Sequence, residues 1–248
     1  MSPHVTVTQI EDGLRQVTID DGKENHLSYE LIDSLTSVLE DLHADSSLRA
    51  VILAGRPDVF CSGGTLQLLQ DMASGAYDEK RLLGILERML QLPVPIVGAV
   101  EGHAIGGGLA LALACDVLFL GESSRYSANS ADLGFTPAMG LTYLLPALLG
   151  DQFAAEMIYT AKYFKGSELT ARCKFSPAVP NCEVMSKALD TAQRICEKPR
   201  YVLELAKSTL SLPKRLALQE AATYEPMMHR ICFKHPEAAA RLASDYLG

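Results

Sequence analysis

The stretch that decides the fold runs from Val94 to Asp116 and reads VPIVGAVEGHAIGGGLALALACD. Its segment 96–100 is apolar and rich in β-branched residues, which predicts a buried strand. Gly106, Gly107 and Gly108 follow, and then an uncharged segment that predicts a helix buried on all sides. Glycine costs roughly 1 kcal/mol per helical position relative to alanine. Three in succession therefore indicate a backbone that another group approaches closely.

A helix start of this kind has a chemical use. Its first N–H groups have no partner within the helix and lie at the positive end of the helix dipole, so they can hold a negatively charged oxygen. A second glycine pair, Gly63 and Gly64, lies downstream of a predicted strand at 50–54. Two such corners can direct two backbone N–H donors at one oxygen, which is the arrangement of an oxyanion hole. The alternative is that both corners are tight turns required only for packing.

The order of the elements predicts the fold class. The sequence begins with an N-terminal hairpin, an amphipathic helix, the strand at 50–54 and the glycine corner at Gly63 and Gly64. Together these predict an α/β fold with a mixed sheet and helical crossovers. The two glycine blocks resemble those of the crotonase superfamily, the enoyl-CoA hydratases and isomerases, and the resemblance extends over nearly the whole chain. It implies a spiral core of ββα units over residues 1–180 and a C-terminal helical trimerisation region over 181–248. By position, it also implies that the oxyanion donors are the N–H groups of Gly64 and Gly107.

Composition limits the partners and the location. The chain has 248 residues, of which 48% are apolar and 21% charged, as in a soluble globular protein with a core of its own. No apolar run approaches the roughly 20 residues of a membrane span, so no membrane association is expected. The net charge of −8 argues against a nucleic-acid partner. Six cysteines without CxxC spacing predict reduced thiols in a cytoplasmic protein and no metal site.

The chain departs from the hydratases at their two catalytic glutamates. Register places Ala110 and Ser130 at these positions. Neither side chain can move a proton at neutral pH, and the addition of water needs a positioned acid and a positioned base. The sequence therefore excludes a hydratase. A slip of two residues in the alignment would put Asp132 at the second position, and this alternative stays open.

A subgroup of the superfamily shares further segments with this chain. The segments resemble those of the decarboxylases of polyketide β-branching, which convert a 3-methylglutaconyl group on an acyl carrier protein to 3-methylcrotonyl and CO₂. The shared segments are FCSGGT at 60–65, EGHAIGGG at 101–108, GFTPAMG at 134–140 and MMH at 227–229.

This resemblance implies a catalytic set. The histidine of the subgroup corresponds to His229 on a predicted tail helix, and its lysine and tyrosine come from the variable acyl-pocket region. Lys80 is the only lysine between Lys23 and Lys162, and Tyr77 precedes it by about one helical turn. The alternatives are that His229 is a hydrogen-bonded core residue and that Lys80 is a solvated residue on a helix.

The chemistry of such a site is consistent with the residues. Loss of CO₂ from a γ-carboxylate conjugated to a thioester moves electrons onto the thioester oxygen, where each N–H donor contributes roughly 3 kcal/mol. Because the substrate accepts its own electrons, no cofactor is expected. Lys80 would hold the carboxylate and His229 would direct reprotonation. The expected partners are an acyl group on a carrier protein or coenzyme A and two further copies of the chain. An enoyl-thioester isomerase and an inactive carrier-binding scaffold stay open as alternatives.

Overall fold

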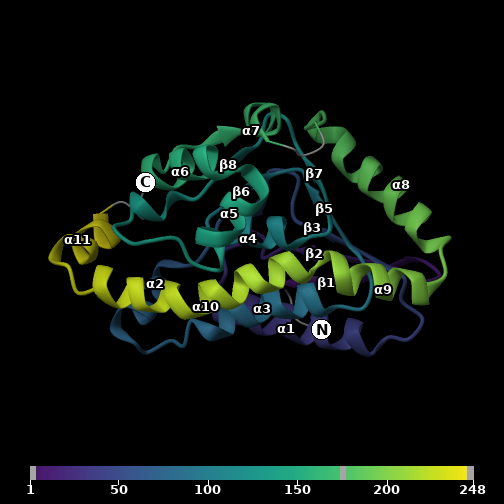
Figure 1. Ribbon diagram of the computed structural model, residues 1–248, viewed down its shortest axis with the longest axis horizontal. Coiled ribbons are helices and arrows are strands. Elements are labelled where there is room, and N and C mark those ends of the chain that lie inside the picture. Colours follow the sequence, from purple (N-terminus) through teal and green to yellow (C-terminus); the bar gives the residue numbers. More distant parts are fainter. Residues whose placement is uncertain (1–3, 174–176, 245–248) are drawn as a thin grey trace.

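The computed structural model describes residues 4–173 and 177–244, which form two sheets surrounded by helices (Figure 1). The first sheet has five strands in the order β1-β2-β3-β5-β7 and the second has four in the order β4-β6-β8-β9. Their bounds are β1 Val5–Glu11, β2 Leu14–Ile19, β3 Ala50–Ala54, β4 Val59–Cys61, β5 Ile96–Val100, β6 His103–Ile105, β7 Val117–Leu120, β8 Arg125–Ser127 and β9 Phe164–Lys165.

The chain alternates between the two sheets. β3, β5 and β7 lie in the first sheet, and the strand that follows each of them, β4, β6 or β8, lies in the second. Within each sheet these successive strands are parallel, so the chain has to cross over between them. The crossovers contain helices α2 (Leu66–Ser74) and α3 (Lys80–Gln91), and then α4 (Gly107–Ala114). Helix α1 (Tyr29–Ala44) connects β2 to β3. The predicted α/β spiral is confirmed.

Helix α4 lies at the centre of the spiral, with seven of its eight residues buried. A methyl group on Gly108 would lie 2.0 Å from the carbonyl oxygen of Cys61, so only glycine allows α4 to pack directly on the backbone of β4. Gly106 has φ +53°, a conformation that L side chains rarely adopt, and turns the chain from β6 into the helix. The close backbone approach predicted from the three glycines is thus confirmed.

The second half of the described chain is mainly helical. The bounds are η1 Asn129–Ala131, α5 Leu141–Leu149, α6 Asp151–Thr160, α7 Gly166–Arg172, η2 Asn181–Glu183, α8 Val184–Cys196, α9 Arg200–Leu210, α10 Leu212–Cys232 and α11 Pro236–Ser244. The helical tail predicted from residue 181 is observed as far as residue 244, and residues 245–248 lie outside the described part.

The tail helices pack on the core, with α8 on the five-stranded sheet and α10 on the neighbouring helices. Small buried residues of α8, including Ala188 and Ala192, form a cluster with Ile52 and Val97 of the five-stranded sheet. Helix α10 contacts α3 and α5, and it lies across α3 in Figure 1. Over the described residues, no helix combines the length and the apolar composition that a membrane crossing requires. The same residues contain no group of three or more metal-ligating side chains.

Two helical glycines provide a matched test of this packing. Gly108→Ala should lower the free energy of unfolding by at least about 2 kcal/mol, because its methyl group meets a backbone carbonyl that cannot move aside. Gly84→Ala in α3 meets only the end of the Arg88 side chain at 3.1 Å and should gain up to about 1 kcal/mol from helix propensity. Urea unfolding of both variants measures the difference. Equal stabilities would contradict the close approach of α4 to β4.

Candidate active site

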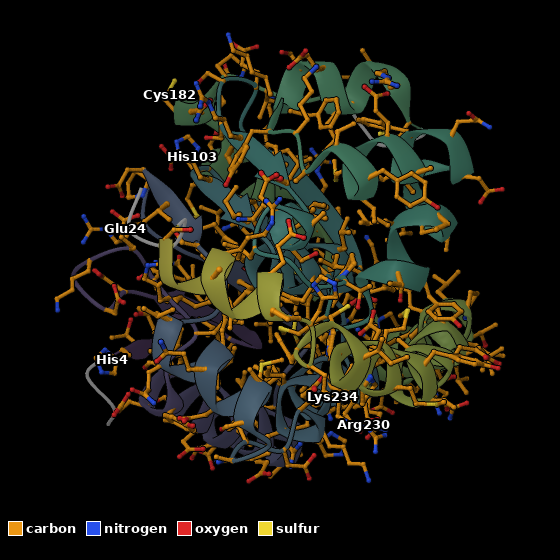
Figure 2. The ribbon with its side chains drawn as sticks, turned by 90° about the vertical axis from the view of Figure 1, so that its left-hand side faces the viewer. His4, Glu24, His103, Cys182, Arg230 and Lys234 are labelled. Atoms are coloured by element: carbon orange, nitrogen blue, oxygen red, sulfur yellow. The ribbon has the colours of Figure 1, made fainter. Side chains whose placement is uncertain are left out.

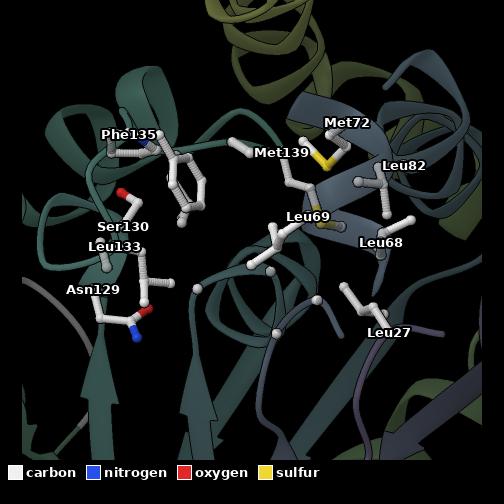
Figure 3. A pocket seen from close by; sticks show the side chains of 18 of the residues that line it. Leu27, Leu68, Leu69, Met72, Leu82, Asn129, Ser130, Leu133, Phe135 and Met139 are labelled. Atoms are coloured by element: carbon white, nitrogen blue, oxygen red, sulfur yellow. The ribbon is translucent and has the colours of Figure 1, made fainter. Parts of the chain in front are cut away.

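A cavity lies between the two glycine corners, α2, the start of α3 and the segment 128–141. It encloses about 620 Å³, including its open mouth. Its walls are mainly apolar, and its polar side chains are those of Ser62, Asn129 and Ser130. Figure 3 shows two sides of this cavity. The labelled side chains that form them are Leu27, Leu68, Leu69, Met72, Leu82 and Met139 on one side and Asn129, Ser130, Leu133 and Phe135 on the other.

The two glycine corners meet at this cavity, and both Gly64 and Gly107 line it. A methyl group on Gly63 would lie 3.6 Å from the backbone nitrogen of Gly107, so the two corners are direct neighbours. The corner at Gly63 and Gly64 is held in place by Leu27, whose N–H donates to the carbonyl of Gly63 at 2.8 Å. Gly107 is the first residue of α4, and its N–H belongs to the helix start that lacks intrahelical acceptors. This arrangement can hold an anionic oxygen.

The positions of the two hydratase glutamates are also fixed by the fold. Ala110 is buried inside α4 and is not among the lining residues, whereas Ser130 lines the cavity from η1. The Ser130 hydroxyl is buried without a hydrogen-bond partner among the described residues. Asp132 is exposed and outside the lining, so the alternative register receives no support. Among the described residues that line the cavity none is charged, and an acid and base for hydration are therefore missing from it.

His229 lies on α10, is fully buried and is not itself a lining residue. Its Nε2 is 2.9 Å from the carbonyl oxygen of Thr136 and 3.1 Å from that of Pro137, and its Nδ1 is 2.5 Å from a carboxylate oxygen of Glu79. Burial acts to lower the pKa of His229, but the hydrogen bond and charge of Glu79, together with the Thr136 carbonyl and the charge of Glu225, outweigh it, so the pKa is raised above its usual 6.5. The histidine is thus in contact with the cavity wall from behind.

Glu225 precedes His229 by one helical turn and contacts the same segment. Its carboxylate accepts hydrogen bonds from the N–H of Gly140 at 2.8 Å and from the N–H and hydroxyl of Thr142 at 3.2 and 2.6 Å. Burial raises the pKa of Glu225. Helix α10 therefore holds both ends of the segment 136–142, which carries part of the cavity wall.

Lys80 and Tyr77 lie outside the lining of the cavity. Lys80 is exposed at the first residue of α3. Tyr77 is buried, with its ring edge-on to Tyr29 at 5.3 Å and the guanidinium of Arg81 5.7 Å from its centre. Burial raises the pKa of Tyr77 to about 12, so the phenol is neutral at physiological pH, and its hydroxyl has no partner among the described residues.

Sequence reasoning missed Glu79 and Glu225. The signal available for Glu225 was its spacing of four residues from His229, which places both on one helix face. No sequence signal pairs His229 with Glu79, which is 150 positions away. His103 precedes the three glycines at 106–108 by three positions in the sequence. It is exposed at the surface (Figure 2), where its Nδ1 accepts a hydrogen bond from the N–H of Arg125 at 3.0 Å.

Comparisons with known proteins agree with this geometry. The family model for enoyl-CoA hydratase/isomerase matches residues 9–243. The bacillaene synthase decarboxylase PksI of Bacillus subtilis is 34% identical over 245 residues, which cover 98% of this chain and 97% of that protein.

Two solved structures have the same fold over nearly their whole length. One belongs to a dehydratase/decarboxylase enzyme couple of polyketide β-branching, with a TM-score of 0.93, 34% identity and coverage of 99% of this chain and 100% of that chain. The other is the ECH2 decarboxylase domain of CurF from Lyngbya majuscula, with a TM-score of 0.89, 31% identity and coverage of 98% and 99%.

Proposed function

The chain belongs to the enoyl-CoA hydratase/isomerase family, and we propose that it decarboxylates a 3-methylglutaconyl thioester to the 3-methylcrotonyl thioester in polyketide β-branching. The observation that carries this proposal is a cavity with two adjacent glycine corners and no charged lining residue among those described. Hydration needs an acid and a base, whereas decarboxylation needs an electron sink and one proton. The similar decarboxylases support the second reaction.

In the proposed mechanism the thioester oxygen binds to the N–H groups of Gly64 and Gly107. The bond between the γ-carbon and the carboxylate breaks, CO₂ leaves, and the electron pair moves through the conjugated system onto the thioester oxygen. The donors stabilise the resulting dienolate, and each contributes roughly 3 kcal/mol. The apolar walls favour the same step, because the localised charge of the carboxylate is poorly solvated there and CO₂ is neutral.

We assign the protonation of the dienolate to His229, with Lys80 and Tyr77 completing the catalytic set. His229 is separated from the cavity by Phe135 and Pro137, so proton transfer requires a movement of the turn at 136–137 or of the segment before α3. Lys80 would have to fold over the cavity to bind the carboxylate. The hydroxyl of Tyr77 is a neutral donor that becomes usable in the same movement.

The proposed substrate is carried by an acyl carrier protein or by coenzyme A, and the proposed location is the cytoplasm. All six cysteines lie in the described residues and none is in a disulfide, which agrees with a reducing compartment. The substrate supplies its own electron sink, so the proposal includes no cofactor.

The deciding experiment incubates the protein with 3-methylglutaconyl thioester in D₂O and follows CO₂ and the position of deuterium in the product. Wild type should release CO₂, and His229→Ala should be slow or should divide the label between the α- and γ-carbons, because the dienolate then lacks its proton donor. Lys80→Ala and Tyr77→Phe are measured in the same assay. Unchanged turnover and label would remove the corresponding residue from the mechanism.

The same assay separates the alternatives. Movement of the double bond in an enoyl thioester without CO₂ release would indicate an isomerase. Carrier binding without any turnover would indicate a scaffold. Either outcome in wild type would contradict the proposed decarboxylation.

The backbone N–H of Gly107 is one of the two proposed oxyanion donors. Gly107→Pro removes its N–H and should lower turnover by roughly 10²-fold or more. Gly107→Ala is the matched control, since its methyl group meets the same ends of Leu27 and Met139 at 2.6 and 2.8 Å but the N–H remains. Similar rates for the folded proline and alanine variants would show that Gly107 is required only for packing.

Helices α9 and α10 expose large apolar side chains, including Leu205 at 67%, Leu210 at 75% and Ile231 at 73%. Apolar surface of this extent indicates a protein partner, and we propose a homotrimer formed through these helices. Sedimentation equilibrium at micromolar concentration should give three chain masses for wild type and a lower mass for Leu205→Glu. A monomeric wild type would contradict the trimer.

A further inference from the structure

We propose that Glu79 is a positioning residue for His229: it holds the imidazole in its charged form and thereby fixes the turn at Thr136 and Pro137 against the cavity. The proposal rests on the function proposed above for its catalytic consequence, but its structural content can be measured without turnover. The observation behind it is one buried ring that contacts Glu79, the residue before α3, through one nitrogen and the turn through the other.

The hydrogen-bond partners determine where the protons of His229 lie. A backbone carbonyl oxygen can only accept, so Nε2 must carry a proton to bond Thr136 and Pro137. An ionised carboxylate can also only accept, so Nδ1 must carry the second proton to bond Glu79 at 2.5 Å. With both nitrogens protonated the ring is an imidazolium, and its hydrogen bonds are of the stronger, charge-assisted kind.

The groups that face His229 leave Glu79 as its direct anionic partner. Glu225 from α10 is the other carboxylate that acts on the ring, and its oxygens are hydrogen-bonded to Gly140 and Thr142. The rings of Phe135 and Phe233, both 5.8 Å from the imidazole centre, exclude water from it. Without Glu79, the largest influence on the pKa of the ring is burial, which favours the neutral form.

The turn at Thr136 and Pro137 connects His229 to the space beside the N–H of Gly107. Residues 137–139 line the cavity immediately after the carbonyls that bond His229. Met139 has φ +57°, a strained conformation for a side chain other than glycine, so neighbouring contacts must maintain it. Its sulfur is 2.8 Å from the position of a methyl group on Gly107, so a shift of the turn would alter the space beside that N–H.

The direct test measures the charge of His229 by NMR of ¹⁵N-histidine-labelled protein. A His229→Gln spectrum assigns the signal. In wild type at pH 7.5 both ring nitrogens should be protonated, and in Glu79→Gln one nitrogen should lose its proton, since burial is the largest influence on the pKa of His229 and lowers it. The control is Glu87→Gln, an identical change at an exposed position within α3, which should leave the signal unchanged. An imidazolium that persists in Glu79→Gln at pH 7.5 would overturn the proposal.

The catalytic consequence is tested by the pH profile of turnover. A raised pKa keeps His229 charged above 6.5, so wild-type kcat should fall only on the alkaline side of that value. In Glu79→Gln the alkaline decrease in kcat should begin at a lower pH. Each unit of that shift lowers the imidazolium fraction at alkaline pH roughly tenfold, and activity should return at acidic pH.

The outcomes are distinguishable. An equal loss of kcat at every pH would show that Glu79 is required only for packing and would contradict the positioning role. A shifted NMR signal with an unshifted profile would contradict the link between Glu79 and catalysis. Absence of CO₂ release by wild type would refute the proposed function, while the NMR result would still decide whether Glu79 holds the charge of His229.

Discussion

The architecture depends on one close contact, the approach of the start of α4 to the backbone of β4. Glycine at position 108 allows this contact because any side chain would overlap the carbonyl of Cys61. The contact brings the end of one ββα turn onto the next, so that Gly63 and Gly107 become neighbours although 44 positions separate them in the sequence. The same glycines that cost helix propensity therefore create a surface where a backbone N–H can reach a substrate oxygen.

The cavity beside this contact differs from a hydration site because its described lining residues include no charged side chain. A buried alanine and a serine hydroxyl that has no hydrogen-bond partner in the described part of the chain occupy the positions where hydratases of the family carry carboxylates. An apolar wall disfavours a localised charge and has little effect on one that is spread over a conjugated thioester and held by N–H donors. A reaction that converts a carboxylate into neutral CO₂ gains from both properties.

The C-terminal helices contribute to the site as well as to its surroundings. Helix α10 contacts the segment 136–142 at both ends, through an imidazole that donates and a carboxylate that accepts. These contacts lie behind the wall, where water is excluded and a hydrogen bond to a charged group is worth more than at the surface. The surface proposed for the trimer lies on α9 and α10, so the helix that contacts the cavity wall also carries part of that surface.

The sequence by itself determined the elements, the two glycine corners and the loss of the hydratase carboxylates. These features follow from local rules: strand and helix periodicity, the cost of glycine in a helix, and the inability of Ala110 and Ser130 to carry protons. Only the tertiary structure decided that Ser130 lines the cavity while Asp132 is exposed, that Lys80 is solvated, and that His229 is bonded to Glu79. These facts depend on packing between segments far apart in the chain, and such contacts leave no local pattern in the residues that make them.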